Sequence, residues 1–92
     1  MNGENGLKIR LYTRRWCGYC TAARRLLAKL DVEFEEIPLD GNPELRRSIA
    51  EANGNWPTVP MIFVGERFVG GYRELSRLKK SGELDRILEG AA

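Results

Sequence analysis

Cys17 and Cys20 are the only cysteines of the 92-residue chain, which has no histidine. They form a C-x-x-C pattern in the stretch W-C-G-Y-C (residues 16–20). A disulfide across so short a loop removes little entropy from the unfolded chain, so a purely structural bridge would stabilise the fold only slightly. A zinc site takes about four ligands, which two cysteines without histidine supply only across a dimer. The pattern therefore indicates redox chemistry between two thiols.

Length, composition and charge restrict the class of protein. The length suits one small domain, which we expect to span residues 1–92 with a loose N-terminus at 1–6. The net charge is +2, and the sequence lacks the basic stripe of a nucleic-acid binder. No apolar run approaches the roughly 20 residues that span a bilayer, and the opening MNGENG is unlike a signal peptide. We expect a cytoplasmic monomer without nucleic-acid or membrane partners.

Hydrophobic periodicity predicts an α/β fold with the element order β-α-β-α-β-β-α-α. A strand is expected over 7–12, where apolar and polar residues alternate, and a helix from about 18 to 30, where leucines recur at helical spacing. The later elements are a strand over 32–39, a helix from Asn42 to Asn53, strands on either side of Gly65-Glu66, and helices after Gly71 and Gly82. This order predicts a mixed sheet with helices on both faces.

Several apolar residues are expected to pack rather than to do chemistry. The second helix should bury Leu45, Ile49 and Ala52. Trp16, just before the motif, should either pack or shield the sulfurs. Trp56 is expected to pack in a loop near the groove.

Cys17 is expected where the first strand ends and the first helix begins. The free N–H groups of a helix start point toward such a residue, and the helix dipole with Arg14 and Arg15 favours its thiolate. Cys20 lies one turn later on the same helix face, within reach of a disulfide. It should be more buried and less acidic. We therefore predict that Cys17 attacks and that Cys20 resolves.

Three motifs, in this order, resemble those of a dithiol glutaredoxin, a small member of the thioredoxin fold. They are C-G-Y-C at 17–20, T-V-P at 58–60 and G-G-Y-R-E-L at 70–75. The resemblance covers nearly the whole chain, from Leu7 to Glu89. It implies a thioredoxin fold with a four-stranded mixed sheet. It also implies a glutathione-dependent oxidoreductase that reduces protein disulfides and glutathione mixed disulfides.

The resemblance further implies a glutathione site beside the cysteines. In this family the proline after T-V is cis, and a cis Pro60 would turn the backbone of Val59 toward the sulfurs as a strand-like edge for a bound peptide. Tyr19 would lie at the lip of the groove, and Arg14 would contact the glycine carboxylate of glutathione. The implied glutathione contacts are Arg14, Tyr19, Thr58, Val59, Pro60, Gly71, Tyr72, Arg73 and Glu74.

The third motif departs from the family at two positions. Family members usually have Asp, preceded by Ser, Thr or Asp, where this chain has Glu74 preceded by Arg73. Backbone N–H groups at this helix start can still hold the γ-glutamyl carboxylate. Glu74 can replace Asp as the partner of the ligand's amino group, whereas Arg73 places a like charge beside that group and should weaken binding.

Two other functions remain open. W-C-G-x-C fits a reductase-coupled, thioredoxin-like electron carrier that ignores glutathione, although thioredoxins have Pro where Tyr19 stands. Glutaredoxins with a small residue at the position of Gly18 are those in which two subunits and two glutathiones can hold a [2Fe–2S] cluster. No metal-binding residues are predicted within a single chain.

Overall fold

Eight elements follow one another in the predicted order. The structure, a computed structural model, describes residues 8–89, so the predicted loose terminus and the start of the first predicted strand lie outside the described residues. The elements are β1 (Ile9–Thr13), α1 (Gly18–Lys29), β2 (Phe34–Pro38), α2 (Pro43–Ala52), β3 (Met61–Val64), β4 (Arg67–Gly70), α3 (Tyr72–Ser81) and α4 (Glu83–Glu89). β2 is shorter than the predicted 32–39 at both ends, and the predicted bounds of α2, Asn42 and Asn53, are the capping residues on either side of that helix.

The four strands form one mixed sheet in the order β2-β1-β3-β4. β1 is parallel to β2 and antiparallel to β3, and β3 and β4 form an antiparallel hairpin. A parallel pair needs a long crossover connection, which α1 provides. The carboxyl ends of β1 and β2 therefore lie at one edge of the sheet, where the chain leaves β1 toward Cys17.

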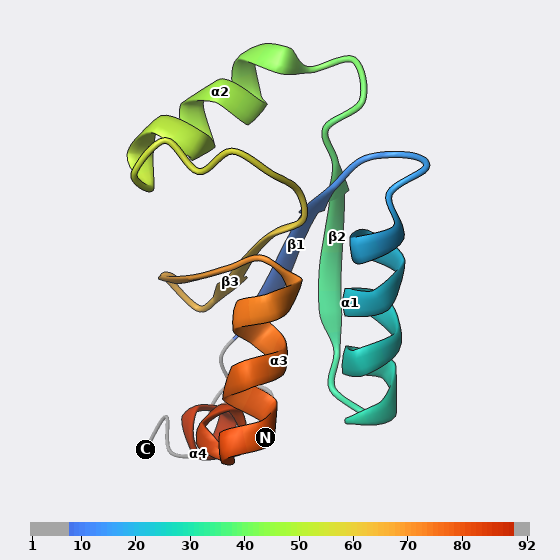
Figure 1. Ribbon diagram of the computed structural model, residues 1–92, viewed down its shortest axis with the longest axis vertical. Coiled ribbons are helices and arrows are strands. Elements are labelled where there is room, and N and C mark those ends of the chain that lie inside the picture. Colours follow the sequence, from blue (N-terminus) through green and yellow to red (C-terminus); the bar gives the residue numbers. More distant parts are fainter. Residues whose placement is uncertain (1–7, 90–92) are drawn as a thin grey trace.

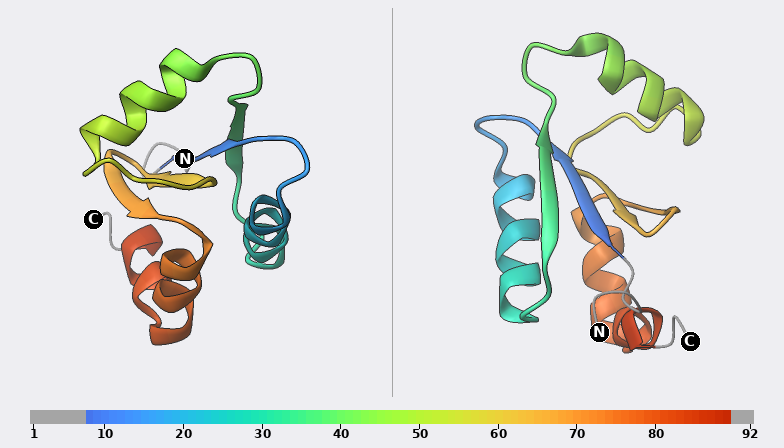
Figure 2. Two further views of the ribbon diagram at one scale, coloured as in Figure 1. Left: turned by 45° about the horizontal axis from the view of Figure 1, so that its top comes forward. Right: turned by 180° about the vertical axis from the view of Figure 1, so that it is seen from behind.

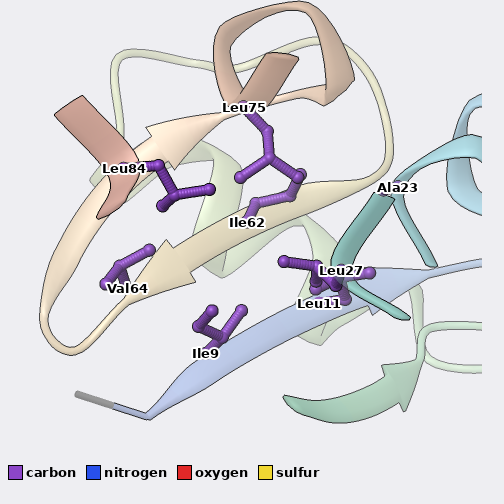
Figure 3. Close-up of a cluster of buried hydrophobic side chains, with 8 residues drawn as sticks. All are labelled: Ile9, Leu11, Ala23, Leu27, Ile62, Val64, Leu75 and Leu84. Atoms are coloured by element: carbon purple, nitrogen blue, oxygen red, sulfur yellow. The ribbon is translucent and has the colours of Figure 1, made fainter. Parts of the chain in front are cut away.

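Helices cover both faces of the sheet, as predicted. Figures 1 and 2 show α2 on one face and α1, α3 and α4 on the other. On the second face, the two strands at the centre of the sheet meet the three helices in one buried apolar cluster (Figure 3), formed by Ile9, Leu11, Ala23, Leu27, Ile62, Val64, Leu75 and Leu84. Each fully buried side chain of leucine size contributes about 1.5–3 kcal/mol. This cluster holds α1 and α3 in place against the sheet.

A second buried cluster lies toward α2 and contains both cysteines. Its buried members are Cys17, Cys20, Leu39, Val59 and Met61. The predicted packing of α2 is partly wrong, because this helix has no fully buried residue. Leu45, Ile49 and Ala50 are partly buried against the cluster, whereas Ala52 is exposed, since the last turn of the helix does not pack on it. Within residues 8–89, no helix is long and apolar enough to cross a membrane.

Candidate active site

Cys17 occupies the position just before α1, as the sequence predicted. Its sulfur accepts a hydrogen bond from the backbone N–H of Cys20 at 3.1 Å. Its thiol also approaches the carbonyl oxygen of Val59 at 3.7 Å. Both cysteines are free thiols, so the structure shows the reduced form. The sulfur of Cys17 therefore lies at the positive end of the α1 dipole, held between α1 and the segment before β3.

Cys20 lies behind Cys17 and has no exposed surface, whereas Cys17 is 9% exposed. Burial, followed by the hydrogen bond to Cys17, raises the pKa of the Cys20 thiol from 9.0 to about 12. A backbone hydrogen bond from Arg14 and the charge of Arg24 act in the opposite direction. Cys20 is therefore a neutral thiol at physiological pH. The predicted difference in burial between the two cysteines is confirmed.

The T-V-P segment, residues 58–60, directly precedes β3 and lies against the start of α1. The Val59–Pro60 peptide bond is cis, as the resemblance implied. Both residues are buried, and the carbonyl of Val59 points to the thiol of Cys17. The backbone at 58–60 therefore borders the reacting sulfur directly.

A cavity of about 250 Å³ opens beside this segment. The structure brings together around it eight of the nine residues that the resemblance assigned to glutathione: Tyr19, Thr58, Val59, Pro60, Gly71, Tyr72, Arg73 and Glu74. We call it the T-V-P cavity. The ring of Tyr19, which is 57% exposed, stacks on that of Tyr72 with a centroid distance of 6.2 Å. The two rings form one wall, and Tyr19 is exposed as expected.

Trp56 also lines the T-V-P cavity, although the sequence predicted for it only a packing role in a loop near the groove. Its indole packs edge-on against Phe68, with ring centroids 5.2 Å apart. The nearby T-V-P motif is the only sequence signal that could have assigned Trp56 to the site.

Glu74 has a partner within its own helix start. Its Oε1 accepts a hydrogen bond from the backbone N–H of Gly71 at 2.9 Å. The preceding Gly70 has φ +119°, and a Cβ added there would lie 2.9 Å from Cγ of Glu74 and 3.1 Å from the indole of Trp56. The first glycine of the motif therefore leaves the space in which the carboxylate and the indole lie.

Arg14 does not join the other predicted residues. It lines a larger cavity, of about 610 Å³, that lies beside Arg15, Trp16 and Cys17 and shares no lining residue with the T-V-P cavity. The guanidinium of Arg14 donates to the carbonyl of Arg15 at 3.1 Å. The expectation that Trp16 packs is wrong, whereas its shielding of the sulfurs stays a prediction. Its backbone is left-handed, at φ 57°, and its side chain projects into solvent, 89% exposed.

A polar network joins the ends of β1 and β2 to the first turn of α1. Oε2 of Glu36 accepts from the buried hydroxyl of Thr13 at 2.8 Å and from Arg24 at 2.7 Å. Arg24 also donates to the hydroxyl of Thr21 at 3.0 Å, and that hydroxyl donates to the carbonyl of Cys17 at 3.3 Å. No sequence motif marks these residues. Their contacts fix the start of α1, and hence Cys17, relative to the sheet.

The described part of a single chain does not supply enough ligands for a metal ion or an iron–sulfur cluster. Among residues 8–89, no group of three or more His, Cys, Asp and Glu side chains lies close enough to hold a metal ion. A Cβ at Gly18 would meet nothing within 4 Å, so there is open space beside the motif. Any cluster at Cys17 would need further ligands from outside the chain.

A reduced thiol pair at a helix start, on this mixed sheet, defines a thiol–disulfide oxidoreductase of the thioredoxin fold. The Glutaredoxin family model matches residues 9–69, and the chain belongs to the glutaredoxin family. It is 46% identical to a glutaredoxin of Pseudomonas aeruginosa over 78 residues, covering 85% of this chain and 92% of that protein. It is 37% identical to glutaredoxin 3 of Escherichia coli over 81 residues, covering 88% of this chain and 96% of that protein.

Solved structures agree on the fold. The solution structure of a Brucella melitensis glutaredoxin is 40% identical, with a TM-score of 0.80, and the match covers 91% of this chain and 90% of that one. The crystal structure of a buckwheat glutaredoxin–glutathione complex has a TM-score of 0.84 at 23% identity, covering 90% of this chain and 77% of that one. The predicted fold and family are therefore confirmed.

Proposed function

We propose that the protein is a glutathione-dependent thiol–disulfide oxidoreductase that reduces glutathione mixed disulfides and protein disulfides. The observation that carries the proposal is the T-V-P cavity. It is linked to the nucleophile through Val59, whose carbonyl faces the thiol of Cys17 and which also lines the cavity. The cavity measures about 250 Å³, slightly less than the usual range of about 300–1,000 Å³ for small-molecule pockets. It therefore suits a small ligand, such as a tripeptide, better than a larger one. The buckwheat relative in complex with glutathione supports the same assignment.

The start of α3 supplies the groups that distinguish glutathione from other thiols. The first N–H groups of a helix have no carbonyl partner within it and favour an anion. Because Glu74 already binds the N–H of Gly71, the γ-glutamyl carboxylate would use the backbone N–H groups of Tyr72 and Arg73. The carboxylate of Glu74 would hold the ligand's amino group. The cysteinyl part would lie along Val59 as an added strand.

The chemistry follows from the roles of the two thiols. The thiolate of Cys17 attacks the glutathione sulfur of a mixed disulfide, the old S–S bond breaks, and the substrate leaves as a thiolate that takes up a proton. A second glutathione thiolate then attacks the Cys17–glutathione bond, which releases oxidised glutathione and the Cys17 thiolate. With a protein disulfide, Cys17 attacks first and Cys20 displaces the substrate, forming the Cys17–Cys20 disulfide that two glutathiones reduce.

Arg14 is assigned less directly. The resemblance implies that Arg14 contacts the glycine carboxylate of glutathione, but Arg14 lines the larger cavity. Its guanidinium would have to break the hydrogen bond to the carbonyl of Arg15 to reach the ligand. The proposed reaction needs the reduced glutathione of a reducing compartment, so we propose a cytoplasmic location.

A coupled assay on the purified protein tests the proposal. Reduction of a small glutathione mixed disulfide is followed with reduced glutathione, and in parallel with thioredoxin reductase as the electron source. We expect turnover with glutathione only. Turnover that requires thioredoxin reductase and ignores glutathione would assign the protein to the thioredoxin-like carriers instead.

A further inference from the structure

A groove between α1 and α3 starts at the active-site end of the molecule and leads away from it. Both helices lie on the same face of the sheet and start toward the same end (Figures 1 and 2). The groove has a volume of about 370 Å³, and Tyr72, which also lines the T-V-P cavity, lines it as well. The two cavities therefore adjoin at Tyr72, the one lining residue that they share. We call this groove the α1–α3 groove.

The α1–α3 groove is basic with an apolar floor. Leu26, Leu30 and Tyr72 are partly buried against the core cluster and form the floor. Arg25 and Lys29 of α1 and Lys79 of α3 stand around it. Among the described residues, none with an acidic side chain lines the groove. Of the three cations, only Lys79 is in an ion pair, with Asp85 at 3.7 Å, and both side chains of that pair are partly exposed.

We propose that the α1–α3 groove docks an acidic segment of the disulfide-bearing protein substrate. This inference rests on the proposed function, because the segment must belong to the chain whose cysteine reacts with Cys17. The inference is carried by the basic side chains around the groove, which suit an acidic segment, and by the shared lining residue Tyr72, which places the groove next to the T-V-P cavity. A narrow groove with an apolar floor fits a short peptide that has both acidic and apolar side chains. A membrane surface would need a broad basic face instead.

The helix geometry fixes where the acidic residues must lie in the substrate. Arg25 and Lys29 follow Cys17 by eight and twelve residues, which correspond to about 12 and 18 Å along a helix. An extended peptide covers about 3.3 Å per residue. The matching acidic residues should therefore lie about four and five residues from the substrate cysteine.

Two peptides that differ only in charge test the proposal. Each carries one cysteine in a mixed disulfide with glutathione, and has either glutamates or glutamines four and five residues away on both sides. We expect the acidic peptide to have a kcat/KM roughly three- to tenfold higher at low ionic strength, the size that two exposed ion pairs provide, and the advantage to shrink as salt is added. A small glutathione mixed disulfide without a peptide measures the basal reaction.

The R25E/K29E double variant is the decisive case, since both side chains are exposed and neither belongs to the redox site. It should lose or reverse the preference for the acidic peptide while its kcat/KM with the small disulfide stays unchanged. The matched control is K80E, an exposed charge reversal on α3 that does not line the groove and should keep the preference. Loss of the preference in K80E as well would indicate a long-range charge effect and overturn the assignment.

Three further results would overturn either the docking proposal or the proposed function. Equal use of the two peptides by the unmodified protein overturns the proposal. Binding to phosphatidylserine vesicles that R25E/K29E abolishes, without any peptide preference, would assign the groove to a membrane surface and also overturn it. Absence of turnover with the small disulfide would instead refute the proposed function itself, so the two failures are distinguishable.

Discussion

The backbone N–H of Cys20 donates a hydrogen bond to the sulfur of Cys17 across 3.1 Å, and in the proposed reaction the same two residues form the disulfide. The contact gives the two thiols different environments. It holds the Cys17 sulfur at the helix start, while the proximity of that sulfur helps to keep Cys20 protonated. When Cys17 is consumed in a mixed disulfide, its charge and its hydrogen bond to the Cys20 thiol are lost, so the pKa of Cys20 should fall. In the proposed mechanism, the thiol of Cys20 would therefore become more reactive only after Cys17 has reacted.

The first prediction separates the roles of the two thiols. Cys17→Ser should abolish every thiol-transfer reaction, because no other side chain in the site supplies the nucleophile. Cys20→Ser should keep deglutathionylation, in which glutathione resolves the intermediate, and should lose most reduction of protein disulfides. Both variants are assayed with a glutathione mixed disulfide and with a protein disulfide. Equal losses in both assays would contradict the assigned roles.

The second prediction concerns the pH dependence of stability through Cys20. Folding raises the pKa of this thiol from 9.0 to about 12, so the folded state favours the neutral form. The resulting stabilisation is fully present below about pH 9 and is lost as the pH rises toward 12. Denaturant unfolding of the reduced protein from pH 7 upward, compared with Cys20→Ala, should show a difference in stability that shrinks over this range. A difference that stays constant would contradict the burial of an uncharged thiol.

The third prediction separates the two tasks of Glu74. If its carboxylate holds the ligand's amino group, Glu74→Ala should raise the KM for glutathione by roughly five- to thirtyfold, or about 1–2 kcal/mol, and change kcat less. Glu74→Gln keeps an oxygen for the N–H of Gly71 but removes the charge. It should therefore retain the stability that the cap provides and still show the raised KM.

Steady-state kinetics with glutathione as the varied substrate, together with thermal unfolding, measures both effects. A normal KM in Glu74→Gln would mean that Glu74 only caps its own helix. Arg73→Ala is the companion variant, and it should preserve or improve binding, because it removes a like charge beside the ligand's ammonium group.

The fourth prediction compares the two adjacent glycines before α3. Gly70→Ala places a Cβ 2.9 Å from Glu74 and 3.1 Å from Trp56 at a φ of +119°, which an L side chain rarely adopts. The strain alone should cost about 1–3 kcal/mol of stability. Gly71→Ala meets its nearest neighbour at 3.5 Å, at an ordinary φ of −103°, and should unfold nearly as the parent does. Thermal unfolding of both variants checks this, and similar midpoints would contradict the packing described for Gly70.

Local patterns in the sequence predicted the elements and the placement of the nucleophile. Alternation along β1 and leucine spacing along α1 fix where the strand ends and the helix starts, so Cys17 had to precede a helix start. The order of the three motifs predicted the fold. Each motif lies where a helix or strand begins or ends, and the fold brings these places together at one end of the sheet. These signals are short-range, or depend only on the order of the elements, and both can be read without coordinates.

The motifs predicted eight lining residues of the T-V-P cavity, and only the tertiary structure decided that Trp56 belongs to the set and that Arg14 does not. Trp56 joins the T-V-P cavity because the glycine at 70 leaves room for its indole, and Arg14 leaves that set because its loop turns to the other side of Cys17. The network around Glu36 joins the consecutive elements β1, α1 and β2 through side chains that lie 12 and 23 positions from Glu36. Such contacts depend on the exact approach of packed elements and on the direction of individual side chains, and neither periodicity nor motif spacing specifies these.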